Sequence, residues 1–254
     1  MNIMPTKPRG IYLLPNLFTI ASIFSGYFSM IASYKGLYEA AAVAIFIAMI
    51  MDNLDGRIAR LTNTMTAFGA QFDSMADMVS FAVAPALLAY TWGLHNLGKI
   101  GWIVAFVYTV AVALRLARFN TQADGSGRRY FQGLPCPMGA AMVSGFIWFC
   151  TDLSYITPTA VILLASIVLL VALLMVSNIR YRSFKDVDLK NHVKFVVILA
   201  TVTIVVLVSI DPEKVLLAIF TIYTTSGPIA TIWGLRQKRL LRKKARDGKG
   251  VKAG

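Results

Sequence analysis

The chain has 254 residues, of which 57% are apolar and only 15% are charged, and its mean hydropathy is +0.66. Soluble domains carry about 25% charged residues, so this composition excludes an ordinary soluble protein and indicates a membrane protein. The sequence lacks the segments of alternating polarity that are typical of an outer-membrane barrel, so the expected fold is all-α. The net charge of +13 would favour a nucleic-acid partner in a soluble protein, but here the charges follow membrane topology and we expect no nucleic acid.

Long apolar stretches predict about eight transmembrane helices, because about 20 apolar residues cross the hydrocarbon core of a bilayer. In chain order, we expect helices at residues 11–33, 37–62, 66–92, 98–119, 136–152, 156–178, 192–210 and 213–235. These helices form one polytopic, membrane-embedded domain at residues 1–235. Residues 236–254 are predicted to form a basic cytoplasmic tail that is partly disordered.

The basic residues indicate the orientation of this domain. With a cytoplasmic N-terminus, only Lys35, Lys99 and Lys214 among the 25 lysines and arginines lie outside. Positive charge gathers on the cytoplasmic side, so we expect both termini in the cytoplasm and the protein in the inner, cytoplasmic membrane of the cell. The basic tail can then contact an anionic lipid bilayer. The two long polar loops, at residues 120–135 and 180–191, face the same side, and we expect polar chemistry there.

Four of the twelve acidic residues lie within one 26-residue window: Asp52, Asp55, Asp73 and Asp77. An aspartate in a transmembrane helix costs several kcal/mol unless it faces a polar cavity, a partner or a metal, so each is a candidate for function. At about 100° per residue, Asp52 and Asp55 share one face of the second helix, and Asp73 and Asp77 share one face of the third. A short turn joins these helices, so the two faces can meet in an antiparallel pair.

Four carboxylates in a small volume cannot all stay ionised without cations nearby. Oxygen ligands without His or Cys favour Mg²⁺, Mn²⁺ or Ca²⁺ over zinc, and four aspartates suffice for two ions. Gly56 and Gly69 leave the helix backbone open to a phosphate group, and Arg60 offers a guanidinium suited to phosphate. The structural alternative is that the aspartates form buried ion pairs with Arg57 and Arg60, which would explain two of the carboxylates but not four.

This acidic segment also resembles a known signature. Its fixed positions are, in order, Asp52, Asp55, Gly56, Ala59, Arg60, Gly69, Asp73 and Asp77. The spacing matches, without a gap, the signature of the CDP-alcohol phosphotransferases. Within that family, the chain looks like the integral-membrane CDP-diacylglycerol–serine O-phosphatidyltransferases (phosphatidylserine synthases), through strings that begin at Leu14, Arg115, Gly133 and Ser177. The resemblance covers the first six predicted helices and the loop that follows them.

The resemblance implies the CDP-alcohol phosphotransferase fold, a homodimer and a transfer reaction catalysed by the domain at residues 1–235. Asp52, Asp55 and Asp73 would ligate two divalent cations, Mg²⁺ or Mn²⁺. Asp77 would complete the second metal site and act as the general base. The expected reaction moves the phosphatidyl group from CDP-diacylglycerol to L-serine and releases CMP. The residues that would bind CDP-diacylglycerol are Asn16, Gly56, Ala59, Arg60 and Gly69.

Serine needs a cation for its carboxylate. Arg118 and Arg180 are our candidates, because each lies at the end of a predicted helix and inside a resembling string. Asn120 and Tyr181 are expected to add hydrogen bonds to serine.

Two alternatives stay open. The same chemistry can serve another acceptor alcohol, such as glycerol 3-phosphate or inositol phosphate, or an ether-lipid donor. A phosphorylated acceptor would need a pocket for a doubly charged phosphate. An ion-coupled transporter is a remote alternative, because it would spread its carboxylates over several helices near the middle of the membrane.

Overall fold

The computed structural model describes residues 13–121, 130–153, 156–182 and 195–250. Its elements are α1 (Leu13–Tyr34), α2 (Tyr38–Leu61), α3 (Ala67–Asp77), the π-helical turn η2 (Met78–Val83), α4 (Ala84–Trp92), the 3-10 turn η3 (Leu94–Leu97), α5 (Lys99–Thr121), β1 (Tyr130–Gln132), α6 (Cys136–Asp152), α7 (Pro158–Val176), β2 (Arg180–Arg182), α8 (Phe195–Ile210) and α9 (Pro212–Gly250). Because α3, η2 and α4 follow one another without a break, the described chain forms eight long helices at the eight predicted places. The all-helical prediction is confirmed, apart from two short strands that it did not include.

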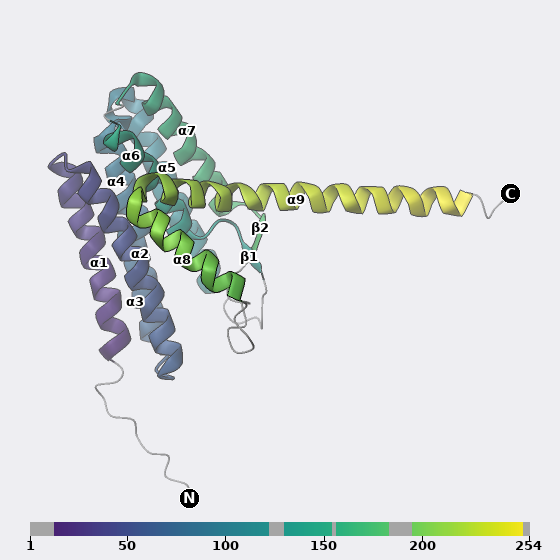
Figure 1. Ribbon diagram of the computed structural model, residues 1–254, viewed down its shortest axis with the longest axis horizontal. Helices are drawn as coiled ribbons and strands as arrows, with labels where there is room; N and C mark the ends of the chain where they lie inside the picture. The colour runs from purple at the N-terminus through teal and green to yellow at the C-terminus, as the bar shows by residue number, and fades with distance from the viewer. Residues whose placement is uncertain (1–12, 122–129, 154–155, 183–194, 251–254) are drawn as a thin grey trace, which may run out of the picture.

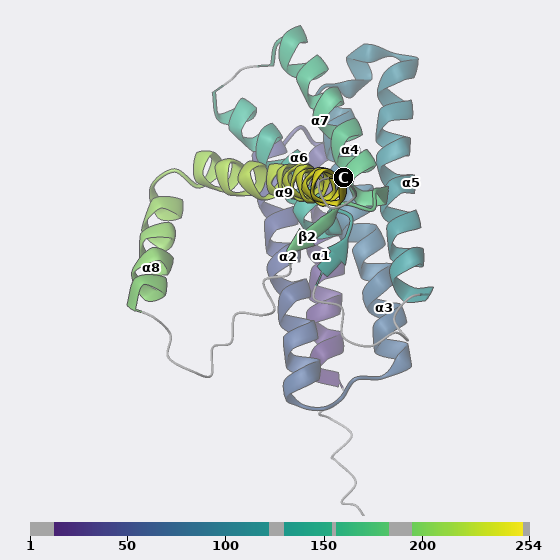
Figure 2. The same cartoon turned by 90° about the vertical axis from the view of Figure 1, so that its right-hand side faces the viewer.

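Small residues let α1 and α2 pack along each other (Figure 1). Ala41 and Ala48 of α2 are fully buried, and the Ser29 hydroxyl of α1 donates a hydrogen bond to the Ala41 carbonyl at 2.8 Å. Small side chains allow the backbones of membrane-embedded helices to approach closely. Since α1 also contacts α3, these three helices form the part of the bundle that holds the acidic residues (Figure 2).

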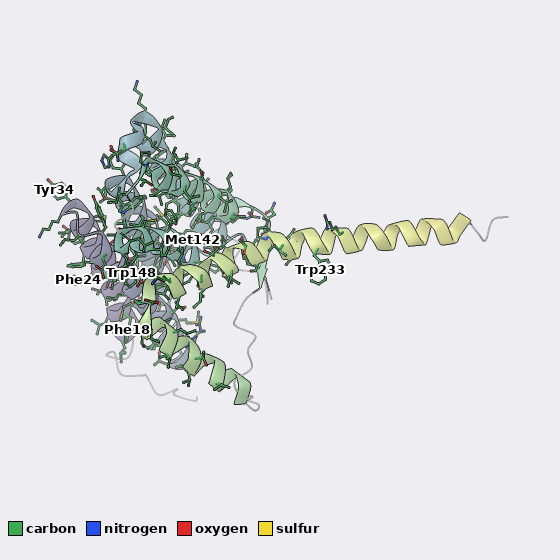
Figure 3. The ribbon with its side chains drawn as sticks, turned by 45° about the horizontal axis from the view of Figure 1, so that its top comes forward. Phe18, Phe24, Tyr34, Met142, Trp148 and Trp233 are labelled. Carbon is green, nitrogen blue, oxygen red and sulfur yellow. The ribbon has the colours of Figure 1, made fainter. Side chains whose placement is uncertain are left out.

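In the described part of the chain, four helical stretches are long and apolar enough to cross a membrane: Leu14–Tyr34, Ala67–Trp92, Lys99–Thr121 and Pro158–Val176. Large apolar side chains lie on the outer surface of the bundle. Phe24 and Tyr34 of α1, for example, are 68% and 86% exposed and point away from it (Figure 3). An apolar exterior around a core rich in small residues suits contact with lipid. The chain is therefore an integral membrane protein, whereas the number of eight crossings and their orientation stay predictions.

The last helix differs from its prediction. The sequence predicts a helix that ends at residue 235 and a partly disordered tail, but α9 continues to Gly250. Figures 1 and 2 show α9 running across the bundle and projecting beyond it. Residues 236–246 consist mainly of Lys, Arg, Leu and Ala, which are strong helix formers, so nothing in this segment stops the helix. The predicted end of the helix is therefore wrong.

Each of the two strands lies in the described part of one polar loop, and the strands pair with each other. β1 and β2 are antiparallel, with Phe131 opposite Tyr181. Tyr181 is fully buried, and its hydroxyl donates a hydrogen bond to the Thr224 carbonyl of α9 at 3.0 Å. Its ring fills the space that a side chain at Gly227 would occupy. The small sheet therefore fastens both loops to α9.

Candidate active site

A capped turn reverses the chain between α2 and α3. The Thr66 hydroxyl accepts a hydrogen bond from the Gly69 amide at 3.0 Å and so caps the N-terminus of α3. The Thr64 amide donates to the Ala59 carbonyl at 3.0 Å, which closes the end of α2. The two helices that carry the aspartates are thereby set antiparallel, as the sequence predicts.

This arrangement gathers three of the four aspartates. Carboxylate oxygens of Asp52, Asp55 and Asp73 all lie within 4.8 Å of one another. The predicted meeting of the two acidic helix faces is confirmed for these residues. Ligand oxygens on opposite sides of a Mg²⁺ ion are about 4 Å apart, so this group is compact enough for a shared cation.

Asp77 lies at the edge of this cluster, close enough to Asp52 and Asp73 for the carboxyl groups to interact electrostatically. Oδ1 of Asp77 and Oδ1 of Asp73 are buried and have no hydrogen-bond partner among the described residues. Buried carboxylate oxygens require a donor or a cation. In the part of the chain that the structure describes, no ion pair joins an aspartate of this cluster to Arg57 or Arg60, so the structural alternative finds no support.

These observations fit a site for divalent cations. The donor set consists of carboxylate oxygens alone, which hard cations such as Mg²⁺ and Mn²⁺ prefer. The unpartnered oxygens of Asp73 and Asp77 are available as ligands. Asp52 and Asp55 supply the opposite helix face.

Thr19 of α1 orients one ligand, a role that the sequence analysis did not assign. Its hydroxyl donates a hydrogen bond to Asp55 Oδ2 at 2.8 Å, and both side chains are buried. This bond fixes the orientation of a carboxylate that belongs to the cluster. The only sequence signal was that Thr19 lies in the string of α1 that begins at Leu14.

We expect Thr19→Val to weaken activation by Mn²⁺ about tenfold to a hundredfold, because a hydrogen bond to a charged group contributes about 1.5–3 kcal/mol. The measurement is the Mn²⁺ concentration that gives half-maximal turnover. Thr91→Val is the matched control, since the Thr91 hydroxyl donates only to carbonyls of its own helix. Equal Mn²⁺ dependence in Thr19→Val and the wild type would rule out the orienting role.

The predicted CDP-diacylglycerol residues lie around the aspartates. A Cβ atom on Gly56 would meet only the guanidinium of Arg60, at 3.9 Å, so the backbone there is open. A Cβ atom on Gly69 would lie 3.9 Å from Asn16 Oδ1, which shows that α1 approaches α3 at this glycine. Ala59 is half-buried and Arg60 is exposed on the last turns of α2. The structure thus brings these five residues to one end of the α1–α3 group.

Arg118, the first predicted serine ligand, already has protein partners. Its guanidinium donates hydrogen bonds to Gln132 Oε1 at 2.9 Å and to Asn178 Oδ1 at 2.5 Å. It thereby ties the end of α5 to β1 and to the segment that precedes β2.

The other predicted serine ligands are more scattered. Asn120 exchanges hydrogen bonds with the Ser74 hydroxyl, at 3.1 and 3.3 Å, and so lies beside α3. The Tyr181 hydroxyl donates a hydrogen bond to the Thr224 carbonyl of α9. The backbone of Arg180 lies in β2 opposite Gln132, but its side chain lies outside the described residues.

Arg115 is a basic residue that the sequence analysis did not select as a serine ligand. Its guanidinium donates to Cys136 Sγ at 3.1 Å, and its Nε is buried without a partner among the described residues. Its charge acts on Asp77, so it lies within electrostatic range of the cluster. Arg115 opens the string that also contains Arg118.

Comparison with known proteins assigns a family to this geometry. Residues 12–179 match the CDP-alcohol phosphatidyltransferase family. The chain belongs to this family. The matched residues include all four aspartates and the predicted CDP-diacylglycerol residues, whereas α8 and α9 lie outside the match. The family predicted from the aspartate spacing is confirmed.

Individual relatives extend beyond the matched segment. A CDP-diacylglycerol–serine O-phosphatidyltransferase of Helicobacter pylori is 37% identical over 220 residues, which cover 87% of this chain and 92% of the relative. A protein of the same name from Mycobacterium leprae is 30% identical over 237 residues, or 89% and 79% of the two chains. An archaetidylserine synthase of Methanothermobacter thermautotrophicus is 34% identical over 179 residues, or 69% and 72%.

Proposed function

We propose that this protein is a CDP-diacylglycerol–serine O-phosphatidyltransferase, which transfers the phosphatidyl group of CDP-diacylglycerol to L-serine and forms phosphatidylserine and CMP. The cluster of Asp52, Asp55 and Asp73, with Asp77 at its edge, carries this proposal. Relatives named for the same reaction support it over most of the chain. The archaeal relative shares serine in its name, which supports serine as the acceptor.

The aspartates are the proposed ligands of two divalent cations, Mg²⁺ or Mn²⁺. Asp52, Asp55 and Asp73 would hold them, and Asp77 would complete the second metal site. When bound, such cations neutralise the diphosphate and stabilise the charge that develops on the departing CMP. Residues on α1, α2 and α3 would line the cytidine and phosphate groups of the substrate. They are Asn16, Gly56, Ala59, Arg60 and Gly69.

Asp77 is the proposed general base. The serine hydroxyl oxygen forms a bond to the phosphorus that carries the diacylglycerol group, and the bond from that phosphorus to CMP breaks. The hydroxyl proton passes to the Asp77 carboxylate. The buried, unpartnered Oδ1 of Asp77 supports this role, because a general base needs a free oxygen within hydrogen-bond reach of the proton that it accepts.

Arg118 and Arg180 remain our candidates for the serine carboxylate. Asn120 supports this side of the site, because its partner Ser74 directly follows Asp73 in α3. Tyr181 would contribute by holding β2 in place, since its hydroxyl donates a hydrogen bond to the Thr224 carbonyl of α9.

We also propose that the site opens to the cytoplasm of the cell, with both termini on that side of the inner membrane. The distribution of lysine and arginine supports this orientation. The basic end of α9 would contact anionic lipid head groups. A homodimer is proposed from the family resemblance.

An acceptor screen tests the proposed function. Purified protein in detergent micelles receives labelled CDP-diacylglycerol, Mn²⁺ and one acceptor: L-serine, glycerol 3-phosphate or inositol phosphate. We expect a labelled lipid product and an equal amount of CMP with serine alone. Turnover with a phosphorylated acceptor and none with serine would contradict the proposed acceptor but leave the family unchanged. An ether-lipid donor in parallel reactions tests the alternative donor.

A further inference from the structure

The helix that carries Asp73 and Asp77 changes its winding directly after Asp77. It is α-helical to Asp77, π-helical from Met78 to Val83 and α-helical again from Ala84. Within this turn the Ala84 amide donates to the Val79 carbonyl, five residues back instead of four. One extra residue in a turn rotates the preceding helix by about 100° relative to the following helix. The π-turn therefore sets the direction in which Asp77 faces.

Pro85 explains why the turn forms here. Proline has no amide hydrogen, and its ring clashes with the carbonyl four residues earlier, which is that of Phe81. Pro85 therefore cannot offer the Phe81 carbonyl the amide donor that a regular α-helix would supply. Tyr108 of α5 supplies one, because its hydroxyl donates to Phe81 O at 2.9 Å. Tyr108 is 1% exposed and Phe81 is fully buried, so water cannot replace this donor.

Two other helices hold the same turn. The Ser80 hydroxyl donates to the Ser22 carbonyl of α1 at 2.9 Å, and a Cβ atom on Gly26 would lie only 2.7 Å from Ser80 Cα. The Ser22 hydroxyl in turn donates to the Ala48 carbonyl of α2 at 3.2 Å. Ser22 lies one helical turn after Thr19, and Ala48 lies one turn before Asp52. The π-turn is thus fastened to the turns of α1 and α2 that build the acidic cluster.

We propose that Tyr108 is a positioning residue of the active site, which holds the π-turn through the Phe81 carbonyl and thereby keeps Asp77 facing Asp52. The proposal rests on the proposed function, since Asp77 is the general base and a metal ligand there. Tyr108 itself touches none of the four aspartates through a hydrogen bond among the described residues. Its effect passes through the rotation of α3.

The test compares Tyr108→Phe with Tyr38→Phe in the full-length protein. Tyr38 is a matched control, because its hydroxyl also donates to a carbonyl of the same long helix, Thr91 O at 3.0 Å, but away from the π-turn. Mn²⁺ affinity of the purified protein is measured by electron paramagnetic resonance, which needs no acceptor, and unfolding temperature and kcat are measured beside it. We expect Tyr108→Phe to weaken Mn²⁺ binding about tenfold to a hundredfold and Tyr38→Phe to leave it unchanged. Equal Mn²⁺ affinity in both variants would overturn the proposal.

The double variant Pro85→Ala/Tyr108→Phe separates positioning from stability. A restored amide at position 85 can donate to the Phe81 carbonyl, so the helix can continue as a regular α-helix. We expect the unfolding temperature to recover while Mn²⁺ affinity and kcat stay low, because Asp77 then faces another direction. Recovery of Mn²⁺ affinity would overturn the proposal, and this variant also serves if Tyr108→Phe does not fold. If the wild type binds Mn²⁺ but does not use serine, the proposed acceptor fails while the role of Tyr108 is still decided.

Discussion

Removal of divalent cations is expected to abolish phosphatidyl transfer, and added Mg²⁺ or Mn²⁺ is expected to restore it. The cluster of Asp52, Asp55 and Asp73 brings carboxylate oxygens within 4.8 Å of one another. Among the described residues, none of these carboxylates forms an ion pair with a lysine or an arginine. Without cations, the diphosphate would meet an array of like charges. Since metal ions contribute several kcal/mol to such reactions, the expected loss is about a thousandfold or more. The measurement is CMP release after dialysis against EDTA.

Single substitutions of the aspartates test which side chains hold the cations. Asp52→Asn, Asp55→Asn and Asp73→Asn should each weaken Mn²⁺ binding as well as turnover, because each removes the charge of one ligand. Asp211→Asn is the matched control, since Asp211 pairs with Lys214 at 3.3 Å at the start of α9. Full turnover in excess EDTA after dialysis would exclude a catalytic role for the cations.

Asp77→Asn is expected to lower kcat about a hundredfold to ten-thousandfold, the usual contribution of a general base. An asparagine keeps the shape of the side chain but cannot accept the serine proton. The KM for CDP-diacylglycerol should change less than in Asp52→Asn, because Asp77 lies at the edge of the cluster. Steady-state kinetics with saturating Mn²⁺ and serine separate these effects. Near-wild-type kcat in Asp77→Asn would show that another group takes the proton.

The acidic site was predictable because residues close together in the sequence determine it. Asp52 and Asp55 are three residues apart and Asp73 and Asp77 are four apart, so helical periodicity alone places each pair on one face. The short turn between the helices then leaves little freedom in how the faces meet. The eight helices were predictable for the same reason, since each contains a long apolar stretch, and the aspartates of the second and third helices keep helical spacing.

Contacts between distant segments were not predictable in this way. The bond from Thr19 to Asp55 joins residues that are 36 positions apart, and the three-residue strands β1 and β2 are too short to show a pattern. The position of Pro85 signals a disturbed helix, but only the packing of Tyr108 shows how the freed carbonyl is satisfied. The full length of α9 was missed because a charged segment resembles a tail, although its residues favour a helix.

The most direct test of the account follows the serine oxygen. Purified protein is incubated with CDP-diacylglycerol, Mn²⁺ and serine whose hydroxyl oxygen carries a heavy isotope, and both products are analysed by mass spectrometry. Direct attack on the phosphorus predicts phosphatidylserine that retains the heavy oxygen and an equal amount of CMP without it. Phosphatidylserine without the heavy oxygen, or CMP that carries it, would contradict the proposed reaction.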